Sequence, residues 1–306
     1  MLDVFICKGQ WERLLERLTK MDRRSFLKHM VWAFLVLIGF SSGTFYYSRE
    51  IETQTLEIRK ESLSSNKIPT TFHNKKIIQF SDTHLGFHFS SKDFKKLAAE
   101  INKRKPDIIV FTGDLIDDPK QLQDGNLVPI IDALRALEAP LGKYWIYGNH
   151  DHGGYGTEIV LDIMEKGGFT LLQNNHVEIN EQNGSIIIAG IDDLMLGKPD
   201  IRTALADADP DLFTILLAHE PDFADETVNY PVDVQLSGHS HGGQVRFPII
   251  GHLYTPLYAE KYVLGKYILR DKLELFVNAG IGTTRVPYRL FCKPEIHEYT
   301  LKTKMS

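Results

Sequence analysis

The stretch DIIVFTGDLID (Asp107–Asp117) joins a short run of large apolar residues to a glycine and two carboxylates. Runs rich in Ile, Val and Phe that are bounded by Gly and Asp are typical of buried β-strands. Gly113 frees the backbone to turn sharply after the run, because a residue without a Cβ atom accepts conformations that other residues avoid. We therefore predict a strand that leads into a loop carrying Asp114 and Asp117.

The same order, a short apolar run followed by side chains able to bind a metal, occurs at four other places. The apolar runs cover residues 76–80, 143–147, 213–218 and 232–237. The side chains that follow these runs are those of Asp82 and His84; Asn149, His150 and Asp151; His219; and His239 and His241. Residues 91–104, 128–137 and 157–166, which lie between the runs, are predicted to be helices.

This alternation of strands and helices predicts an α/β fold. In such folds ligands collect beyond the carboxyl ends of the strands. Five separate strand ends would therefore converge on one rim of the molecule. That convergence is the reason to treat the polar residues after the strands as parts of a single site.

The motif GHSHGG (Gly238–Gly243) is the strongest single indication of a metal site. Taken alone, each of the other motifs has a structural alternative: a hydrogen-bonded surface pair for Asp82 and His84, or a helix cap for Asp114. His219 by itself indicates nothing. What favours a metal centre is the occurrence of all five motifs, in order, after predicted strands.

Composition excludes several other classes of protein. The formal net charge is -5 and basic residues do not cluster, so we expect no nucleic-acid partner. The cysteines are Cys7 and Cys292, without a CxxC pair. We therefore expect neither a disulfide framework nor a thiolate zinc site, and any metal would be held by nitrogen and oxygen atoms. At 306 residues the chain can form one sizeable core with an appended segment.

The run MDRRSFLKHMVWAFLVLIGFSSG (Met21–Gly43) has the order of an export signal, with basic residues first, then an apolar stretch, then small residues. Arg23 and Arg24, followed by Ser-Phe-Leu-Lys, resemble the twin-arginine type. A buried or amphipathic helix is disfavoured, because the run has no polar face. We expect export by the twin-arginine translocase to the outer side of the bacterial plasma membrane, the cell wall or the medium.

Two properties of this N-terminal part have alternatives. Cleavage after the small residues and retention as a membrane anchor are both compatible with about 18 mostly apolar residues. Translation could begin at Met1 or at Met21, in which case residues 1–20 are an upstream extension with a short charged helix. We assign residues 1–47 to this extension and signal or anchor, 48–75 to a linker with an edge strand near 53–58, and 76–303 to the main domain.

The ordered set D-x-H, GDxxD, GNHD, a lone His and GHxH resembles the calcineurin-like metallophosphoesterases. The motifs SDTHLG, TGDLID, GNHD and SGHSHGG carry this resemblance, which covers residues 76–301. With the twin-arginine signal, the chain is most similar to exported bacterial members, some of which are named as relatives of UDP-2,3-diacylglucosamine hydrolases. The resemblance implies a four-layer αββα sandwich, in which two mixed β-sheets are flanked by helices.

The same resemblance implies a role for each motif residue. One divalent cation would bind Asp82, His84, Asp114 and His241. A second would bind Asp114, Asn149, His219 and His239, so that Asp114 bridges the two. His150 would protonate or stabilise the leaving group, and Asp117 would orient His150. The cations would be Zn²⁺ or Mn²⁺, with iron as a further alternative.

The activity implied is metal-dependent hydrolysis of phosphate mono- or diesters by a hydroxide that bridges the two cations. One alternative is hydrolysis of a pyrophosphate bond in a nucleotide-linked lipid such as UDP-diacylglucosamine. A second is a non-catalytic metal-binding scaffold, although such a protein is expected to lack ligands and this chain lacks none. A lipid substrate and association with the membrane or cell wall are compatible with the export signal.

Several residues outside these motifs also have expected roles. His152 and His88 are expected near the rim of the site, with substrate contact as the less favoured alternative. Surface ion pairs are expected for Arg285 and Arg289, with phosphate binding as the alternative. Three smaller expectations are a loop shaped by Asp192 and Asp193, a small buried apolar role for Cys292, and structural or exposed positions for His29, His73, His176, His252 and His297.

Overall fold

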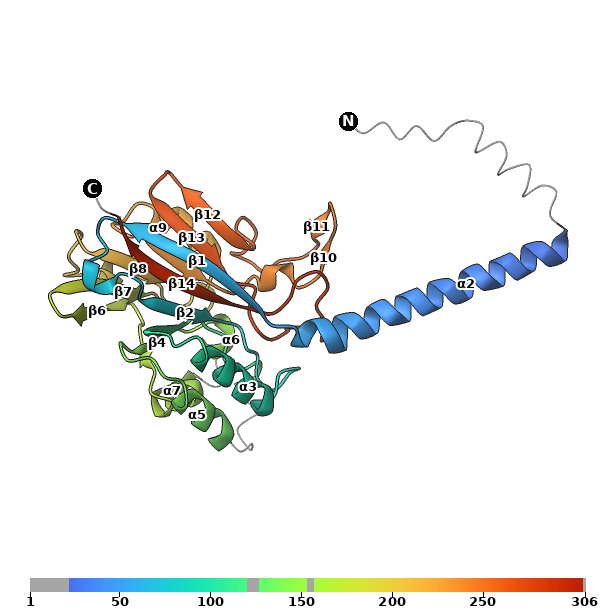
Figure 1. Ribbon diagram of the computed structural model, residues 1–306, viewed down its shortest axis with the longest axis horizontal. Coiled ribbons are helices and arrows are strands. Elements are labelled where there is room, and N and C mark those ends of the chain that lie inside the picture. Colours follow the sequence, from blue (N-terminus) through green and yellow to red (C-terminus); the bar gives the residue numbers. More distant parts are fainter. Residues whose placement is uncertain (1–21, 120–126, 153–156, 305–306) are drawn as a thin grey trace. The chain divides into compact units, whose positions relative to one another are not determined.

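The computed structural model describes residues 22–119, 127–152 and 157–304 (Figure 1). The chain divides into two units, residues 1–47 and residues 48–306. The short charged helix expected within residues 1–20, and the glycines that follow His152, lie outside the described residues.

In the first unit, helix α2 (Arg23–Tyr46) contains most of the predicted export signal. Asp22 caps the helix by accepting a hydrogen bond from the backbone N–H of Ser25 at 2.7 Å. None of the residues of α2 is buried. Within the described part of the chain, α2 and the helical turns Tyr47–Ile51 and Glu52–Gln54 form one span that is long and apolar enough to cross a bilayer.

The second unit contains two six-stranded mixed sheets and a small hairpin. The first sheet has the order β1 (Glu57–Ser65), β14 (Glu295–Thr303), β2 (Lys76–Phe80), β3 (Ile108–Phe111), β4 (Lys143–Trp145) and β5 (Thr170–Leu171). The second sheet has the order β12 (Gly265–Leu269), β13 (Leu273–Val277), β9 (Val234–Ser237), β8 (Phe213–Leu217), β7 (Gly184–Gly190) and β6 (Asn175–Glu181). Strands β10 (Arg246–Phe247) and β11 (Gly251–His252) form the hairpin.

Each central strand is buried on both faces, which explains its continuous apolar sequence. In β2, Ile77 packs into the core between the sheets, whereas Ile78 packs into the core under the outer helices. In β3, Val110 likewise packs into the core between the sheets, and Ile109 packs into the core under the outer helices. The alternation follows from the two-residue period of a strand, and it produces one core between the sheets and one on each outer face.

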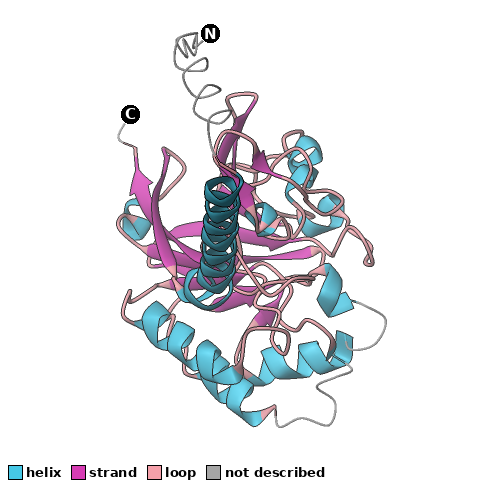
Figure 2. Cartoon of the chain, turned by 90° about the vertical axis from the view of Figure 1, so that its right-hand side faces the viewer, coloured by secondary structure: helices cyan, strands magenta, loops and turns pink. Residues whose placement is uncertain are grey.

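Helices cover the outer faces of both sheets, as Figures 1 and 2 show. Helices α3 (Ser91–Asn102), α5 (Val128–Arg135) and α7 (Thr157–Lys166) pack against the first sheet. The short helices α8 (Ile201–Ala204) and α9 (Ala224–Thr227) pack against the second. The predicted αββα sandwich is confirmed. Most element boundaries differ from the predicted ones by one or two residues, and α3 begins at a capping box formed by Ser90 and Asp93.

Residues 48–75 belong to the compact unit rather than to a separate linker. The edge strand β1 covers residues 57–65 and overlaps the expected region near 53–58 only at its start, because helical turns continue to Gln54. All nine residues of β1 pair in parallel with the C-terminal strand β14. Leu63 of β1 is fully buried in the core between the sheets. This pairing joins the two ends of the domain, which no local pattern in the sequence indicates.

The contribution of β1 can be measured with Leu63→Ala. Removal of a fully buried side chain leaves a cavity, so the variant should lose about 2–4 kcal/mol of unfolding free energy. Urea denaturation followed by circular dichroism is the measurement. Lys60→Ala, at an exposed position of the same strand, should change the unfolding free energy by less than about 0.5 kcal/mol. Equal stability of both variants would mean that the segment behaves as a linker.

Candidate metal centre

Each predicted ligand follows the carboxyl end of a strand, and these strand ends meet at one edge of the sandwich. Strands β2, β3 and β4 are parallel neighbours in the first sheet, as are β8 and β9 in the second. Gln79 Nε2 donates a hydrogen bond to the Ser237 carbonyl at 3.1 Å. The backbone N–H of His239 donates to Asp82 Oδ1 at 3.0 Å. These bonds hold the loop after β2 against the loop after β9.

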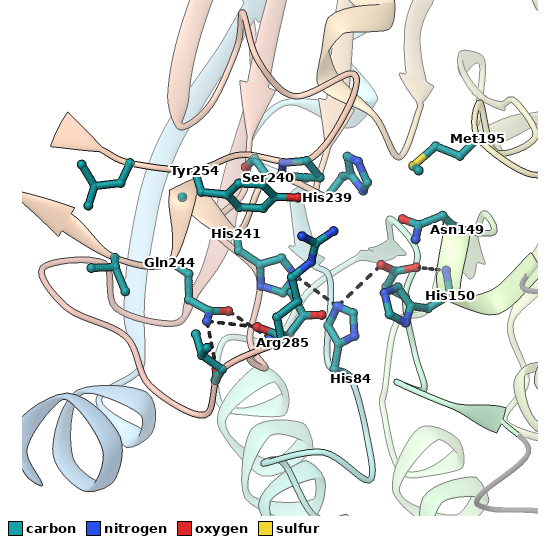
Figure 3. A pocket seen from close by; sticks show the side chains of 17 residues that line it. His84, Asn149, His150, Met195, His239, Ser240, His241, Gln244, Tyr254 and Arg285 are labelled. Carbon is teal, nitrogen blue, oxygen red and sulfur yellow. Dashed lines mark hydrogen bonds and ion pairs between the residues drawn. The ribbon is translucent and has the colours of Figure 1, made fainter. Parts of the chain in front are cut away.

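The first of two buried clusters contains Asp82, His84 and His241, whose potential ligand atoms all lie within 4.8 Å of one another. The Nε2 atoms of His84 and His241 are 3.0 Å apart. His241 Nε2 is 3.5 Å from Asp82 Oδ1. Figure 3 shows the rings of His84 and His241 facing each other. Two nitrogen atoms and a carboxylate oxygen thus converge on one point.

The second cluster contains Asp114, His219 and His239, also buried and within 4.8 Å. His219 Nε2 is 3.3 Å from Asp114 Oδ2 and 3.2 Å from His239 Nδ1. The same Oδ2 atom of Asp114 lies 3.5 Å from His84 Nε2 in the first cluster. Asp114 therefore stands between the two clusters.

Three of the histidines use their second ring nitrogen to bind a group outside the clusters. His219 Nδ1 and His239 Nε2 lie 2.6 Å and 2.9 Å from backbone carbonyl oxygens, and His84 Nδ1 lies 3.0 Å from Asp117 Oδ1. Because the outer partner accepts, the ring N–H points outward and the lone pair of the other nitrogen points into the cluster. Proteins present imidazole to metals in this way.

The ligand loops have an unusual backbone conformation. The φ angles are positive at Asp82 (50°), His84 (43°), Asp114 (62°), His239 (65°) and His241 (50°). Each left-handed, non-glycine residue costs on the order of 1 kcal/mol or more, and such residues concentrate at functional sites. The packing around them is close: a Cβ atom on Gly148 would lie 2.3 Å from Asp114 Oδ1. A Cβ atom on Gly238 would lie equally close, at 2.3 Å, to Asp82 Oδ2.

The donor set fits divalent cations held by nitrogen and oxygen. Asn149 lines the same cavity, and its buried Oδ1 atom accepts no hydrogen bond from the described residues. A buried carbonyl oxygen without a donor costs free energy, which a cation can offset. The two short nitrogen-to-nitrogen distances, 3.0 Å and 3.2 Å, are likewise suited to shared coordination.

Burial and neighbouring charges affect the two cluster carboxylates differently. Burial alone would raise the pKa of Asp114, but the imidazoles of His219 and His150 hold the pKa well below its ordinary value. For Asp82, burial prevails over the opposing effect of His219 and raises the pKa. Asp114 is therefore ionised without help, whereas a nearby cation would favour the ionised form of Asp82.

The two histidines of the GHSHGG motif have lowered pKa values. For His239, burial and then the charge of His219 lower the pKa to about 3. For His241, burial and then the charge of His84 lower the pKa well below its ordinary value. Both imidazoles are therefore neutral at physiological pH, which is the form that binds a cation.

His150 lies beside the clusters and is held mainly by the backbone of residue 117. Its Nδ1 atom is 2.7 Å from the Asp117 carbonyl oxygen, whereas the Asp117 carboxylate is 3.9 Å away and lies closer to His84, at 3.0 Å. Burial lowers the pKa of His150, but the charge of Asp114 and the hydrogen bond to the Asp117 carbonyl outweigh burial and raise it. The protonated form, which can donate a proton, is favoured.

Asp151 is a site residue to which we assigned no role from the sequence. Its buried carboxylate accepts hydrogen bonds from the backbone N–H groups of Asp114 (2.7 Å), Leu115 (2.9 Å) and Gly148 (3.0 Å). Burial and the charge of Asp114 raise its pKa to about 7. Asp151 thereby joins the loop after β3 to the loop after β4. Its position next to His150 in GNHD was a signal that could have identified it.

The clusters open into a cavity of about 330 Å³ with an apolar outer wall. This wall includes Met195, Val245, Leu253, Tyr254, Pro256 and Val286. Arg285 stacks its guanidinium on the ring of Tyr254, 4.7 Å from the ring centroid (Figure 3). The surface ion pair expected for Arg285 is therefore replaced by a cation–π contact that places positive charge at the cavity wall.

The surface ion pair expected for Arg289 is wrong, because its side chain is fully buried. Its Nη2 atom donates to the backbone carbonyls of residues 279, 280 and 282 at 2.8, 3.2 and 2.6 Å. The same atom is 3.4 Å from His241 Nδ1. Carbonyl oxygens thus compensate the desolvation of this cation, which packs behind a cluster histidine.

The two histidines expected near the rim make protein contacts. His152 binds the carboxylate of Asp192 and stacks on Tyr147, with ring centroids 4.5 Å apart. His88 Nε2 lies 3.3 Å from the backbone carbonyl of Arg49. Neither is among the described residues that line the cavity. These contacts give both side chains a structural role.

Two further expectations outside the motifs concern one loop and a cysteine. Asp192 accepts a hydrogen bond from the backbone N–H of Lys198 at 2.8 Å, and Asp193 accepts one from Leu196 at 2.5 Å. Both carboxylates therefore shape their own loop, as predicted. Cys292 is buried, as predicted.

Comparison with known proteins agrees with the family resemblance of the sequence motifs. Residues 75–243 match the family model described as calcineurin-like phosphoesterase. The chain is 46% identical to the metallophosphoesterase YkuE of Bacillus subtilis over 93% of this chain and 99% of that protein. It is 34% identical to a metallophosphoesterase of Aquifex aeolicus over 83% of this chain and 95% of that protein. It is 31% identical to the metallophosphoesterase Cj0846 of Campylobacter jejuni over 88% and 70% of the two chains.

The connection made by Asp151 predicts the effect of Asp151→Ala. The change would leave three backbone N–H groups without their buried acceptor and should cost about 2–4 kcal/mol of unfolding free energy. It should also weaken Zn²⁺ binding, measured by isothermal titration calorimetry, because the loop that carries Asp114 loses its support. Asp162→Ala, which removes an exposed carboxylate paired with Lys166 on α7, is the control and should change neither quantity appreciably. Wild-type stability and affinity in Asp151→Ala would contradict this role.

Proposed function

This chain belongs to the calcineurin-like phosphoesterase family, and we propose that it is an exported, dinuclear member that hydrolyses phosphate mono- or diesters. Membership makes it a metal-dependent phosphoester hydrolase. The observation that carries the finer proposal is the place of Asp114, 3.5 Å from His84 of one cluster and 3.3 Å from His219 of the other. A carboxylate with imidazoles on both sides is suited to two cations at once.

The clusters divide the ligands between two cations. Asp82, His84, Asp114 and His241 would hold the first, and Asp114, Asn149, His219 and His239 would hold the second. Nitrogen and oxygen donors suit Zn²⁺ or Mn²⁺, with iron as a further alternative. The chemistry that bound divalent cations supply is polarisation of the phosphoryl group and a lowered pKa of water.

The protein's own side chains would perform the remaining tasks. His150, oriented by the carbonyl of Asp117, would donate a proton to the departing oxygen. Arg285 would attract the anionic substrate to the cavity wall. Leu253 and Tyr254 would cover the apolar part of the substrate and exclude water from it.

The apolar outer wall favours a second candidate substrate, a pyrophosphate bond in a nucleotide-linked lipid such as UDP-diacylglucosamine. A lipid chain could lie against Met195 and Leu253 while the phosphate groups reach the clusters. We favour ester hydrolysis over this second activity. The clusters bind a phosphoryl group whatever it carries, so they do not by themselves indicate a lipid substrate.

For the cellular location, we propose export through the twin-arginine translocase to the outer side of the bacterial plasma membrane. The pair Arg23 and Arg24 at the start of the apolar helix α2 supports this proposal. Retention of α2 would leave the enzyme anchored in the membrane, and cleavage would release it to the cell wall or the medium.

Activity is tested with p-nitrophenyl phosphate and bis-p-nitrophenyl phosphate in the presence of Mn²⁺ or Zn²⁺. The wild-type chain should hydrolyse at least one of them. Asp114→Ala should lower kcat/KM by about 1000-fold or more, because the change removes a ligand from both clusters. His150→Ala should lower kcat by about 100-fold while metal binding persists, since its role is proton donation.

Asp162→Ala serves as the control and should retain the wild-type rate. A wild-type chain that binds metal but hydrolyses neither these esters nor a nucleotide-linked lipid would be a scaffold instead of an enzyme. Equal losses of metal in the Asp114 and His150 variants would contradict the separate roles assigned to them.

The number of cations is measured by elemental analysis of the purified chain. We expect two equivalents of Zn²⁺ or Mn²⁺ in the wild-type chain and fewer than two in Asn149→Ala. Chelation should lower the melting temperature, because a cation bound only to the folded state stabilises that state. A stoichiometry of one, unchanged by Asn149→Ala, would contradict a dinuclear centre.

A further inference from the structure

The segment of residues 246–258, which we name the apolar hairpin, exposes an unusual amount of apolar surface. It contains β10, β11 and the chain that follows them. The exposed fractions of Ile249, Ile250 and Leu253 are 107%, 71% and 67%. Phe247, Tyr254, Leu257 and Tyr258 in the same segment are also exposed. Contiguous exposed apolar surface of this kind marks a site of interaction.

The apolar hairpin is part of the cavity wall. Leu253, Tyr254 and Pro256 line the cavity, whereas Ile249 and Ile250 at the tip do not. Figure 3 shows the ring of Tyr254 beside His239 and above Arg285. Whatever contacts the tip would therefore also lie next to the mouth of the cavity.

The base of the hairpin is tied to the point where the compact unit begins. Arg289 donates its backbone N–H to the Ser48 carbonyl at 2.9 Å. The next residue, Leu290, exchanges backbone hydrogen bonds with Gln244 (3.0 Å) and Arg246 (2.8 Å). In the sequence, Ser48 lies two residues after the end of the apolar helix α2 and within the Arg23–Gln54 span, which is long and apolar enough to cross a bilayer. The hairpin is thus held close to the C-terminal part of that span.

The charges around the hairpin suit an anionic lipid surface. Residues 238–258 and 280–294 contain no Asp or Glu. Arg285 and Lys293 in these segments are exposed, and Phe291 beside them is an exposed apolar residue. Apolar side chains that insert, together with cations that contact phosphate headgroups, are the features of an interfacial membrane-binding element.

We propose that the apolar hairpin inserts its tip into the surface of a phospholipid bilayer and holds the cavity mouth at the level of the headgroups. Ile249 and Ile250 enter the acyl region, and Arg285 and Lys293 face the headgroup phosphates. One consequence rests on the proposed function: the enzyme reaches phosphoesters that are embedded in the bilayer.

The insertion is tested on the full chain reconstituted into vesicles of phosphatidylcholine and phosphatidylglycerol. Ile249→Cys, in a chain that also carries Cys7→Ser, is labelled with the environment-sensitive fluorophore NBD, while Cys292 is buried. The emission should shift to shorter wavelength and fall about twofold when the vesicles contain lipids spin-labelled on the acyl chain. Ile268→Cys, at another exposed isoleucine, on β12, is the control and should show neither change.

Three results would overturn the proposal. The label at position 249 could report water, or both labels could behave alike. A shift at position 249 without quenching by the spin-labelled lipids would show that the tip contacts protein, such as a second copy of this chain, instead of lipid.

The consequence for the substrate is tested with Ile249→Asp/Ile250→Asp in the same vesicles. Hydrolysis of hexadecyl p-nitrophenyl phosphate embedded in the bilayer should fall about tenfold, because charged residues do not enter the acyl region. Hydrolysis of soluble bis-p-nitrophenyl phosphate should be unchanged. Equal rates of variant and wild type on the embedded ester would overturn the consequence. If the wild-type chain hydrolysed neither ester, the proposed function would fail, and the NBD result would still decide the insertion.

Discussion

The central constraint on this structure is the close approach of several ionisable groups away from water. Asp114 lies 3.3 Å from His219 Nε2 and 3.5 Å from His84 Nε2, and the same His84 atom is only 3.0 Å from His241 Nε2. Groups that are buried in this way lose their hydration, and bound cations can replace it. The ligand loops must therefore be held rigidly, although left-handed backbone conformations make them costly.

The residues that stabilise these ligand loops lie directly behind the ligands. Asp151 binds three backbone N–H groups of the loops after β3 and β4, and Arg289 donates to the carbonyls behind His241. The carboxylate of Asp117 orients His84. Below these polar contacts, β2 and β3 are buried on both faces, so the strand ends cannot shift without disrupting two cores. The positions of the ligand side chains therefore depend on packing throughout the sandwich.

The outer wall of the cavity follows a different principle. There, several apolar side chains remain exposed to solvent instead of packing into a core. A folded chain gains nothing by exposing Ile249 and Ile250 to water, so we attribute their position to the proposed contact with a bilayer and not to stability. The clusters and the hairpin would divide the work: the clusters act on the phosphoryl group, and the hairpin determines where that group is met.

The sequence by itself determined the strands and the residues at the strand ends, because strand burial and ligand chemistry can be read from local patterns such as DIIVF followed by TGDLID. The four-layer sandwich was implied by the resemblance of the ordered motifs to a known family. Only the tertiary structure decided how distant segments meet. The pairing of β1 with β14 and the stacking of Arg285 on Tyr254 depend on partners more than 30 residues away. The burial of Arg289 depends on backbone carbonyls 7 to 10 residues earlier in the chain, which the fold brings around its guanidinium. The same holds for the exposure of the apolar hairpin, since an apolar segment reads alike in sequence whether the fold covers it or leaves it open. Local sequence patterns determine which helices and strands form, and long-range packing determines which of their faces are exposed to water.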